Sequence, residues 1–123
     1  FSSGSRTIAI ELQRSYQHLR DYFRRQERYA QSDVECYWLV RKEQFLTLGK
    51  STRRLLLERE FGNVWPSGGI GTGMLPELPV SILDLKKQEP VVFGGLKSAK
   101  VSVWLQGILS GDYQYRSGSW NLG

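Results

Sequence analysis

The chain has 123 residues, of which 40 % are hydrophobic and 12 % aromatic, enough to bury the core of one domain. Seventeen basic against twelve acidic residues give a net charge of +5, which favours nucleic acid, an acidic membrane surface or an acidic protein surface as partner. No apolar run reaches the length of a membrane span, and the lone Cys36 excludes an internal disulfide. Because the chain begins at Phe1, we expect a processed or trimmed form, and no signal assigns it to a compartment.

The first 31 residues predict one long amphipathic helix. Apolar positions recur in steps of three and four, the a/d spacing of a helix, at Ala9, Leu12, Tyr16, Leu19, Phe23, Gln26 and Ala30. The helix is expected over residues 6–31, with Ser5 as its N-cap and the polar pair Ser32 and Asp33 at its end. Leu19 and Phe23 should be buried, and Arg24 and Arg28 exposed.

The middle of the chain predicts further helix and then a loop. Residues 34–40 (VECYWLV) are β-branched and aromatic, typical of a strand or of a buried segment before a helix. Residues 42–61 predict a helix, a tight turn at Gly49 and a second helix capped by Ser51. Residues 63–79 hold many glycines and prolines, so we expect a long exposed loop or a hinge between two halves, and the most mobile internal segment.

After residue 79 the pattern changes to that of strands. These are expected at 80–85, 90–93, 100–109 and 113–120, with the last pairing back on the third. The predicted fold is α+β, with a long N-terminal amphipathic helix and a short helical pair packed on a small antiparallel β-sheet. One domain, 1–123, would consist of a helical half 1–62, a Gly/Pro-rich loop 63–79 and a β half 80–123.

Five arginines would lie on the helix face opposite to the apolar stripe, all pointing away from the core. They are Arg14, Arg20, Arg24, Arg25 and Arg28. Three of them, Arg20, Arg24 and Arg28, repeat every four residues, where like charges repel by about 0.2–0.5 kcal/mol per pair. A phosphate backbone or a partner's carboxylates would relieve that repulsion. This face is the best candidate for a binding surface, and an ordinary solvated helix face is the alternative.

Two further patterns are compatible with nucleic-acid binding. The helical pair has the outline of a helix-turn-helix, in which Thr52, Arg53 and Arg54 would reach base edges, although this outline is common in α-rich domains. Aromatic residues near the C-terminus could stack single-stranded bases or, as the favoured alternative, form the core of the sheet. They are Trp104, Tyr113, Tyr115 and Trp120, with Arg116 beside them.

Residues for catalysis are sparse. The single histidine, His18, is expected on a helix surface, and Glu58 and Glu60 would point to different faces of their helix. No set of His, Cys and carboxylate residues has metal-ligand spacing, and the glycines match no phosphate-loop motif. We therefore expect no enzymatic activity, no cofactor and no metal.

The predicted function is that of a non-enzymatic basic binding module. It would contact nucleic acid, DNA or RNA, through the arginine-rich helix face and through Arg53 and Arg54. The alternative is a structural or docking subunit of a larger protein assembly, which would use the heptad stripe or exposed aromatic rings. Binding to nucleic acid would weaken steeply with salt, whereas docking through apolar contacts would not.

Overall fold

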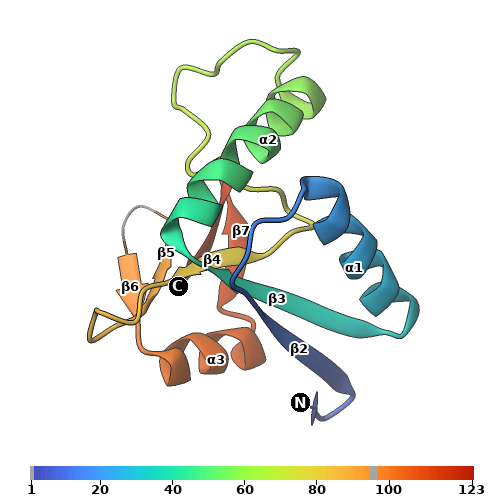
Figure 1. The fold of residues 1–123 in the computed structure, drawn as a ribbon, viewed down its shortest axis with the longest axis vertical. Helices are drawn as coiled ribbons and strands as arrows, with labels where there is room; N and C mark the ends of the chain where they lie inside the picture. Colours follow the sequence, from blue (N-terminus) through green and yellow to red (C-terminus); the bar gives the residue numbers. More distant parts are fainter. Residues whose placement is uncertain (1, 95–96) are drawn as a thin grey trace.

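The computed structural model describes residues 2–94 and 97–123. It contains a six-stranded mixed sheet in the order β1-β2-β3-β4-β5-β6, with helices on both faces (Figure 1). The strands are β1 (Ser2–Ser3), β2 (Arg6–Gln13), β3 (Val34–Val40), β4 (Val80–Leu83), β5 (Val91–Phe93) and β6 (Lys97–Ala99). The helices are α1 (Leu19–Gln31), α2 (Lys42–Glu60) and α3 (Val101–Ser110), and β7 (Tyr113–Arg116) and β8 (Ser119–Leu122) form a separate hairpin.

Three parallel strands form the centre of the sheet. β2 pairs with β3 and β3 with β4, and the connections run through α1 and α2. Both helices cover the same sheet face. This follows because β2, β3 and β4 are adjacent in chain order and the crossover connections between parallel strands are right-handed. On that face Trp38 packs with Tyr22 of α1 and Leu48 of α2, whereas Leu39 packs on the opposite face with Trp104 of α3. The predicted small antiparallel sheet is therefore wrong, because only the outer pairs of the sheet are antiparallel.

The long N-terminal helix is also wrong, because residues 6–13 form β2 and α1 begins only at Leu19. Side chains alternate across a strand, so Ala9 faces the α1 side while Ile8 and Ile10 pack on the α3 side. The β-branched residues Ile8 and Ile10 favour this extended form. Ala9 and Leu12 fell into helical spacing by coincidence.

The helical pair predicted at residues 42–61 is one continuous helix, α2. Gly49 makes no turn, because it lies buried inside the helix, where an added Cβ would touch the carbonyl oxygen of Thr72 at 3.9 Å. Thr52 is buried as well and donates to the carbonyl oxygen of Gly49 at 3.2 Å. The helix-turn-helix interpretation is therefore wrong.

The strand predicted at residues 100–109 is also wrong, because this segment forms α3. Its buried residues, Trp104, Gly107 and Ile108, follow the three-and-four spacing of a helix. The last segment consequently does not pair back on residues 100–109. Its two strands, β7 and β8, pair with each other instead.

The Gly/Pro-rich loop is exposed in its first part and largely buried in its second. Ile70, Met74, Leu75 and Leu78 are buried in the core. The β7–β8 hairpin holds this part, since Trp120 Nε1 donates to the carbonyl oxygen of Leu75 at 3.0 Å. The backbone N–H of Met74 likewise donates to the carbonyl oxygen of Gly118 at 2.9 Å, and Tyr115 to that of Met74 at 2.8 Å. The prediction of an exposed loop is thus wrong for these four buried residues.

We predict that Gly118→Ala will destabilise the protein far more than Gly111→Ala. Both glycines have nearly the same left-handed φ, 85° and 84°, so both variants lose about 1–2 kcal/mol to backbone strain. Only at Gly118 would the new Cβ lie 1.9 Å from the carbonyl oxygen of Ile70, while Gly111 has nothing within 4 Å. Urea denaturation should therefore give a total loss above about 3 kcal/mol for Gly118→Ala. Equal losses would mean that the hairpin does not hold the loop.

Candidate nucleic-acid interface

The outer face of α1 carries a row of exposed arginines, Arg20, Arg24 and Arg28, called here the α1 arginine row. The predicted exposure of Arg24 and Arg28 is confirmed. Tyr22 is the buried residue of the helix, and the residues expected to be buried, Leu19 and Phe23, are half-buried and pack against the core. Within residues 2–94 and 97–123, the α1 arginine row forms one ion pair, between Arg24 and Asp21 at 3.9 Å. The row therefore presents excess positive charge to solvent.

Arg25 does not belong to this row, so the prediction that all five arginines face away from the core is wrong. Its guanidinium donates to the carboxylate of Glu11 at 2.7 Å and to the side-chain oxygen of Gln13 at 3.4 Å. It also lies over the ring of Trp38, with 5.1 Å between the guanidinium carbon and the ring centroid. Successive residues of a helix point about 100° apart around its axis. Arg25 therefore points toward β2, whereas its neighbour Arg24 points to solvent.

Glu11, Gln13, Arg25 and Tyr29 form a half-buried polar cluster between β2 and α1, called here the Glu11 cluster. Glu11 and Gln13 are two residues apart on a strand and so share the sheet face that α1 covers. The hydroxyl of Tyr29 donates to the Glu11 carboxylate, and this hydrogen bond raises the pKa of Tyr29. With two donors on its carboxylate, Glu11 joins the helix to the strand. In the described part of the chain, no group of three or more His, Cys, Asp or Glu residues could hold a metal ion.

A crevice of about 510 Å³ lies where the three parallel strands end, and it is called here the carboxyl-end crevice. In Figure 1 the ends of β2, β3 and β4 come together beside the start of α2. Charged side chains from three chain segments line it, namely Arg14, Arg41, Lys42, Glu43, Asp84 and Lys86. Four cations against two carboxylates leave it positive, and crevices at this end of parallel strands are common ligand sites. Of these cations, only Arg14 was predicted as a site residue. The other three come together because distant strands pair in parallel, and such pairing cannot be predicted from local sequence patterns.

Arg53 and Arg54 lie on α2 away from that crevice. Arg54 is exposed, and Arg53 is half-buried with its guanidinium carbon 5.9 Å from the ring centroid of Trp65. The aromatic residues near the C-terminus mostly belong to the core, since Trp104 and Tyr113 are buried and meet edge to face. The core interpretation is therefore the correct one for these two rings.

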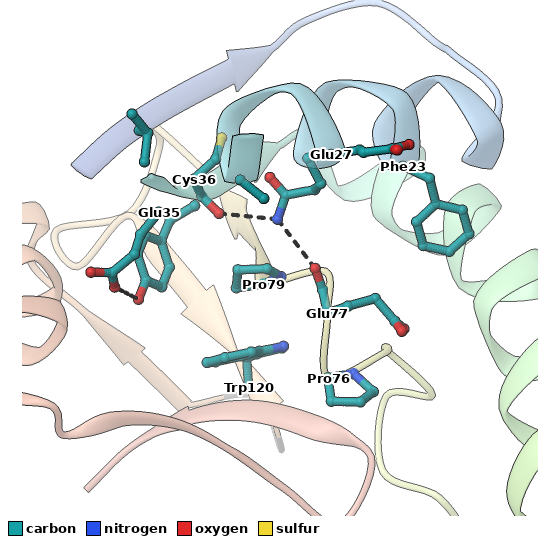
Figure 2. A pocket seen from close by; sticks show the side chains of 12 residues that line it. Phe23, Glu27, Glu35, Cys36, Pro76, Glu77, Pro79 and Trp120 are labelled. Atoms are coloured by element: carbon teal, nitrogen blue, oxygen red, sulfur yellow. Dashed lines mark hydrogen bonds between the residues drawn. The ribbon is translucent and has the colours of Figure 1, made fainter. Parts of the chain in front are cut away.

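A second hollow, of about 450 Å³, lies between α1, β3 and the segment before β4 (Figure 2). Gln26 crosses it, donating to the carbonyl oxygens of Cys36 at 3.3 Å and Glu77 at 3.2 Å. Its charged lining, as far as the chain is described, consists of Glu27, Glu35 and Glu77, so it offers a phosphate no cation. Glu35 and Glu77 are paired with arginines outside the lining, Arg6 at 2.7 Å and Arg59 at 2.8 Å. Burial raises the pKa of the Cys36 thiol to about 12, so this thiol is no nucleophile near neutral pH. This hollow is consequently a poor candidate for a nucleic-acid site.

Comparison with protein families matches the first part of the chain. The model of the family described as competence protein CoiA, nuclease-like domain, matches residues 1–61. This segment contains β1 to α2, and with them the α1 arginine row and the Glu11 cluster. No curated protein and no solved structure matches the chain. The match relates the first half of the chain to nucleic acid, and no helix in the described residues is long and apolar enough to span a membrane.

We predict that Arg25→Gln and Arg24→Gln will differ in stability, although the two residues are neighbours. Arg25→Gln leaves the carboxylate of Glu11, whose side chain is 20 % exposed, without its ionic partner. This loss should cost about 1–3 kcal/mol. Arg24→Gln removes only an exposed contact and should change stability by less than about 0.5 kcal/mol. Urea denaturation of both variants measures the difference, and an equal effect would show that the Glu11 cluster does not join α1 to β2.

Proposed function

We propose that this protein binds nucleic acid through its phosphate backbone, with the α1 arginine row as the main contact. The observation that carries the proposal is the arrangement of the row. Its guanidinium groups repeat every four residues, a rise of about 6 Å per step, so the row extends over about 12 Å. One strand of duplex DNA presents about three or four phosphates over that length.

Arginine is well suited to such a contact. Its planar guanidinium can donate two parallel hydrogen bonds to a phosphate, and it stays charged at any physiological pH. A bound phosphate backbone would also relieve the repulsion among the three arginines, of which only Arg24 has an ionic partner among the described residues, at 3.9 Å. Further contacts are proposed at Arg14 in the carboxyl-end crevice and at Arg53 and Arg54 on α2. Arg25, which was a predicted contact, is instead engaged by Glu11.

The nuclease-like match favours a second candidate function, the cleavage of phosphodiester bonds. Within the matched segment Glu11 has the least exposed carboxylate, at 20 %, and it lies on the face of β2 toward α1. Its two donors, Arg25 and Tyr29, would have to release it before it could act on a substrate or hold a cation. Binding without cleavage is therefore the function that this geometry supports better.

We predict that reversing the charge of the α1 arginine row will weaken binding and flatten its salt dependence. Each neutralised phosphate contributes about −0.7 to −0.9 to the slope of log affinity against log salt. The triple variant Arg20→Glu, Arg24→Glu and Arg28→Glu should reduce the steepness of the slope by about 2–3 and lower the affinity at low salt at least about tenfold. Fluorescence anisotropy with labelled DNA and RNA at several salt concentrations measures both.

The matched control reverses three exposed lysines outside the matched segment, Lys87, Lys97 and Lys100, which changes the net charge equally. If both variants lose affinity alike, binding depends on overall charge and not on the row. If the unmodified protein binds neither DNA nor RNA at low salt, the proposal fails and a docking subunit becomes the better account.

A test for cleavage uses the same labelled probes with added Mg²⁺. We expect the probes to stay intact and Glu11→Gln to leave binding within about twofold of the unmodified protein. Cleavage that disappears in Glu11→Gln would establish the second candidate function instead. Gel electrophoresis of the recovered probes gives the result.

A further inference from the structure

Trp65 is the exposed tryptophan of this chain. It follows the end of α2 and is 55 % exposed, whereas Trp38 and Trp104 are fully buried and Trp120 is half-buried. An exposed tryptophan ring in water is unfavourable, because its large apolar surface contributes to stability only when it is covered. Two apolar neighbours along the chain, Phe61 and Val64, are exposed as well. The segment therefore presents an aromatic surface that the fold itself does not cover.

Arg53 fixes the chemical character of this surface. Its guanidinium carbon lies 5.9 Å from the centroid of the Trp65 ring, within reach of a cation–π interaction. The side chain of Arg53 is held against the backbone of the loop, since a Cβ added at Gly73 would lie 3.0–3.1 Å from it. Two exposed cations of α2, Lys50 and Arg54, lie three residues before and one residue after Arg53. An aromatic ring beside clustered positive charge suits an anionic ligand with a flat apolar part, which describes a nucleotide.

We propose that Trp65 stacks on an unpaired base of single-stranded nucleic acid, while Arg53 and Arg54 contact the phosphates on either side. Stacking on an aromatic side chain is independent of sequence, because every base has a π-face. In a duplex these faces are already covered by neighbouring base pairs, so Trp65 favours single strands. The inference rests on the proposed function, because the α1 arginine row supplies affinity for any strand and Trp65 adds the preference for unpaired bases.

Trp65 lies away from the carboxyl-end crevice, so its effect on binding can be measured separately from that of the crevice. The crevice lies at the first residues of α2, and Trp65 follows its last turn. The Trp65 ring lies beside Arg53, eleven residues after Lys42 at the start of α2, which is a rise of about 16 Å along the helix, so a substitution at Trp65 leaves the crevice unchanged. Trp65 also lies outside the residues matched by the nuclease-like model, which end at 61.

The experiment compares Trp65→Leu and Trp65→Phe with the unmodified protein. Anisotropy is measured at low salt with an oligothymidine of about 16 nucleotides and with a duplex of the same length. Trp65→Leu should bind the single strand about 5- to 100-fold more weakly and the duplex within about twofold of the unmodified protein. Trp65→Phe keeps a ring and should retain most of the single-strand affinity. The control is Tyr16→Leu, which removes another exposed ring, 58 % exposed, and should not change the ratio of the two affinities.

Intrinsic fluorescence provides a second readout. Addition of oligothymidine should quench the tryptophan emission of the unmodified protein, and most of this quenching should be lost in Trp65→Leu. Of the remaining tryptophans, Trp38 and Trp104 are buried, and Trp120 is half-buried with its Nε1 bonded to the carbonyl oxygen of Leu75. Circular dichroism confirms that each variant is folded.

The outcomes separate this inference from the proposed function. Unchanged single-strand binding by Trp65→Leu, an equal loss for both probes, or a Phe variant as weak as the Leu variant would overturn the stacking role and leave the α1 arginine row intact. A selective loss in Trp65→Leu with no effect of the triple arginine reversal would keep the stacking role and overturn the row. Absence of binding to either probe by the unmodified protein would overturn both.

Discussion

The parallel pairing of β2 with β3 is the constraint on which the rest of the molecule depends. Seven residue pairs, from Thr7 with Val34 to Gln13 with Val40, fix the register of the two strands. A parallel pair needs a crossover, and α1 provides it by lying across one face of both strands. The helix must then turn Tyr22 toward Trp38, with their ring centroids 4.8 Å apart, which leaves its opposite face to solvent. The strand register thus decides which arginines are available for binding.

The division of arginines on α1 follows from the same packing. Arg25 reaches the carboxylate of Glu11 and covers Trp38, so its charge is compensated inside the protein. Arg20 and Arg28 are exposed and point to solvent. A half-buried charge such as that of Arg25 needs a partner inside the protein, whereas an exposed charge is stabilised by water and stays available to a ligand. The inner arginine stabilises the fold, and the proposed binding role belongs to the outer ones.

The sequence could predict the features that depend on local spacing. Of the two alternatives for residues 34–40, the strand is the correct one, and the exposure of Arg24 and Arg28 was predicted correctly, since each follows from neighbouring residues. β2 was missed because Ala9 and Leu12 fit a helical period by coincidence, and α3 was missed because its apolar residues resemble those of a strand. The carboxyl-end crevice and the Trp65 surface depend on contacts between distant segments. Such contacts leave no periodic signal in a single sequence.

The most direct test of the account is to map backbone amide chemical shifts by NMR during titration with a single-stranded oligonucleotide. We expect the largest changes along α1 around Arg24 and at residues 53–65, because the α1 arginine row and Trp65 contact the oligonucleotide. The amides of α3, Val101–Ser110, lie on the opposite sheet face and should not move. Changes centred on α3, or no changes at all at low salt, would contradict the account.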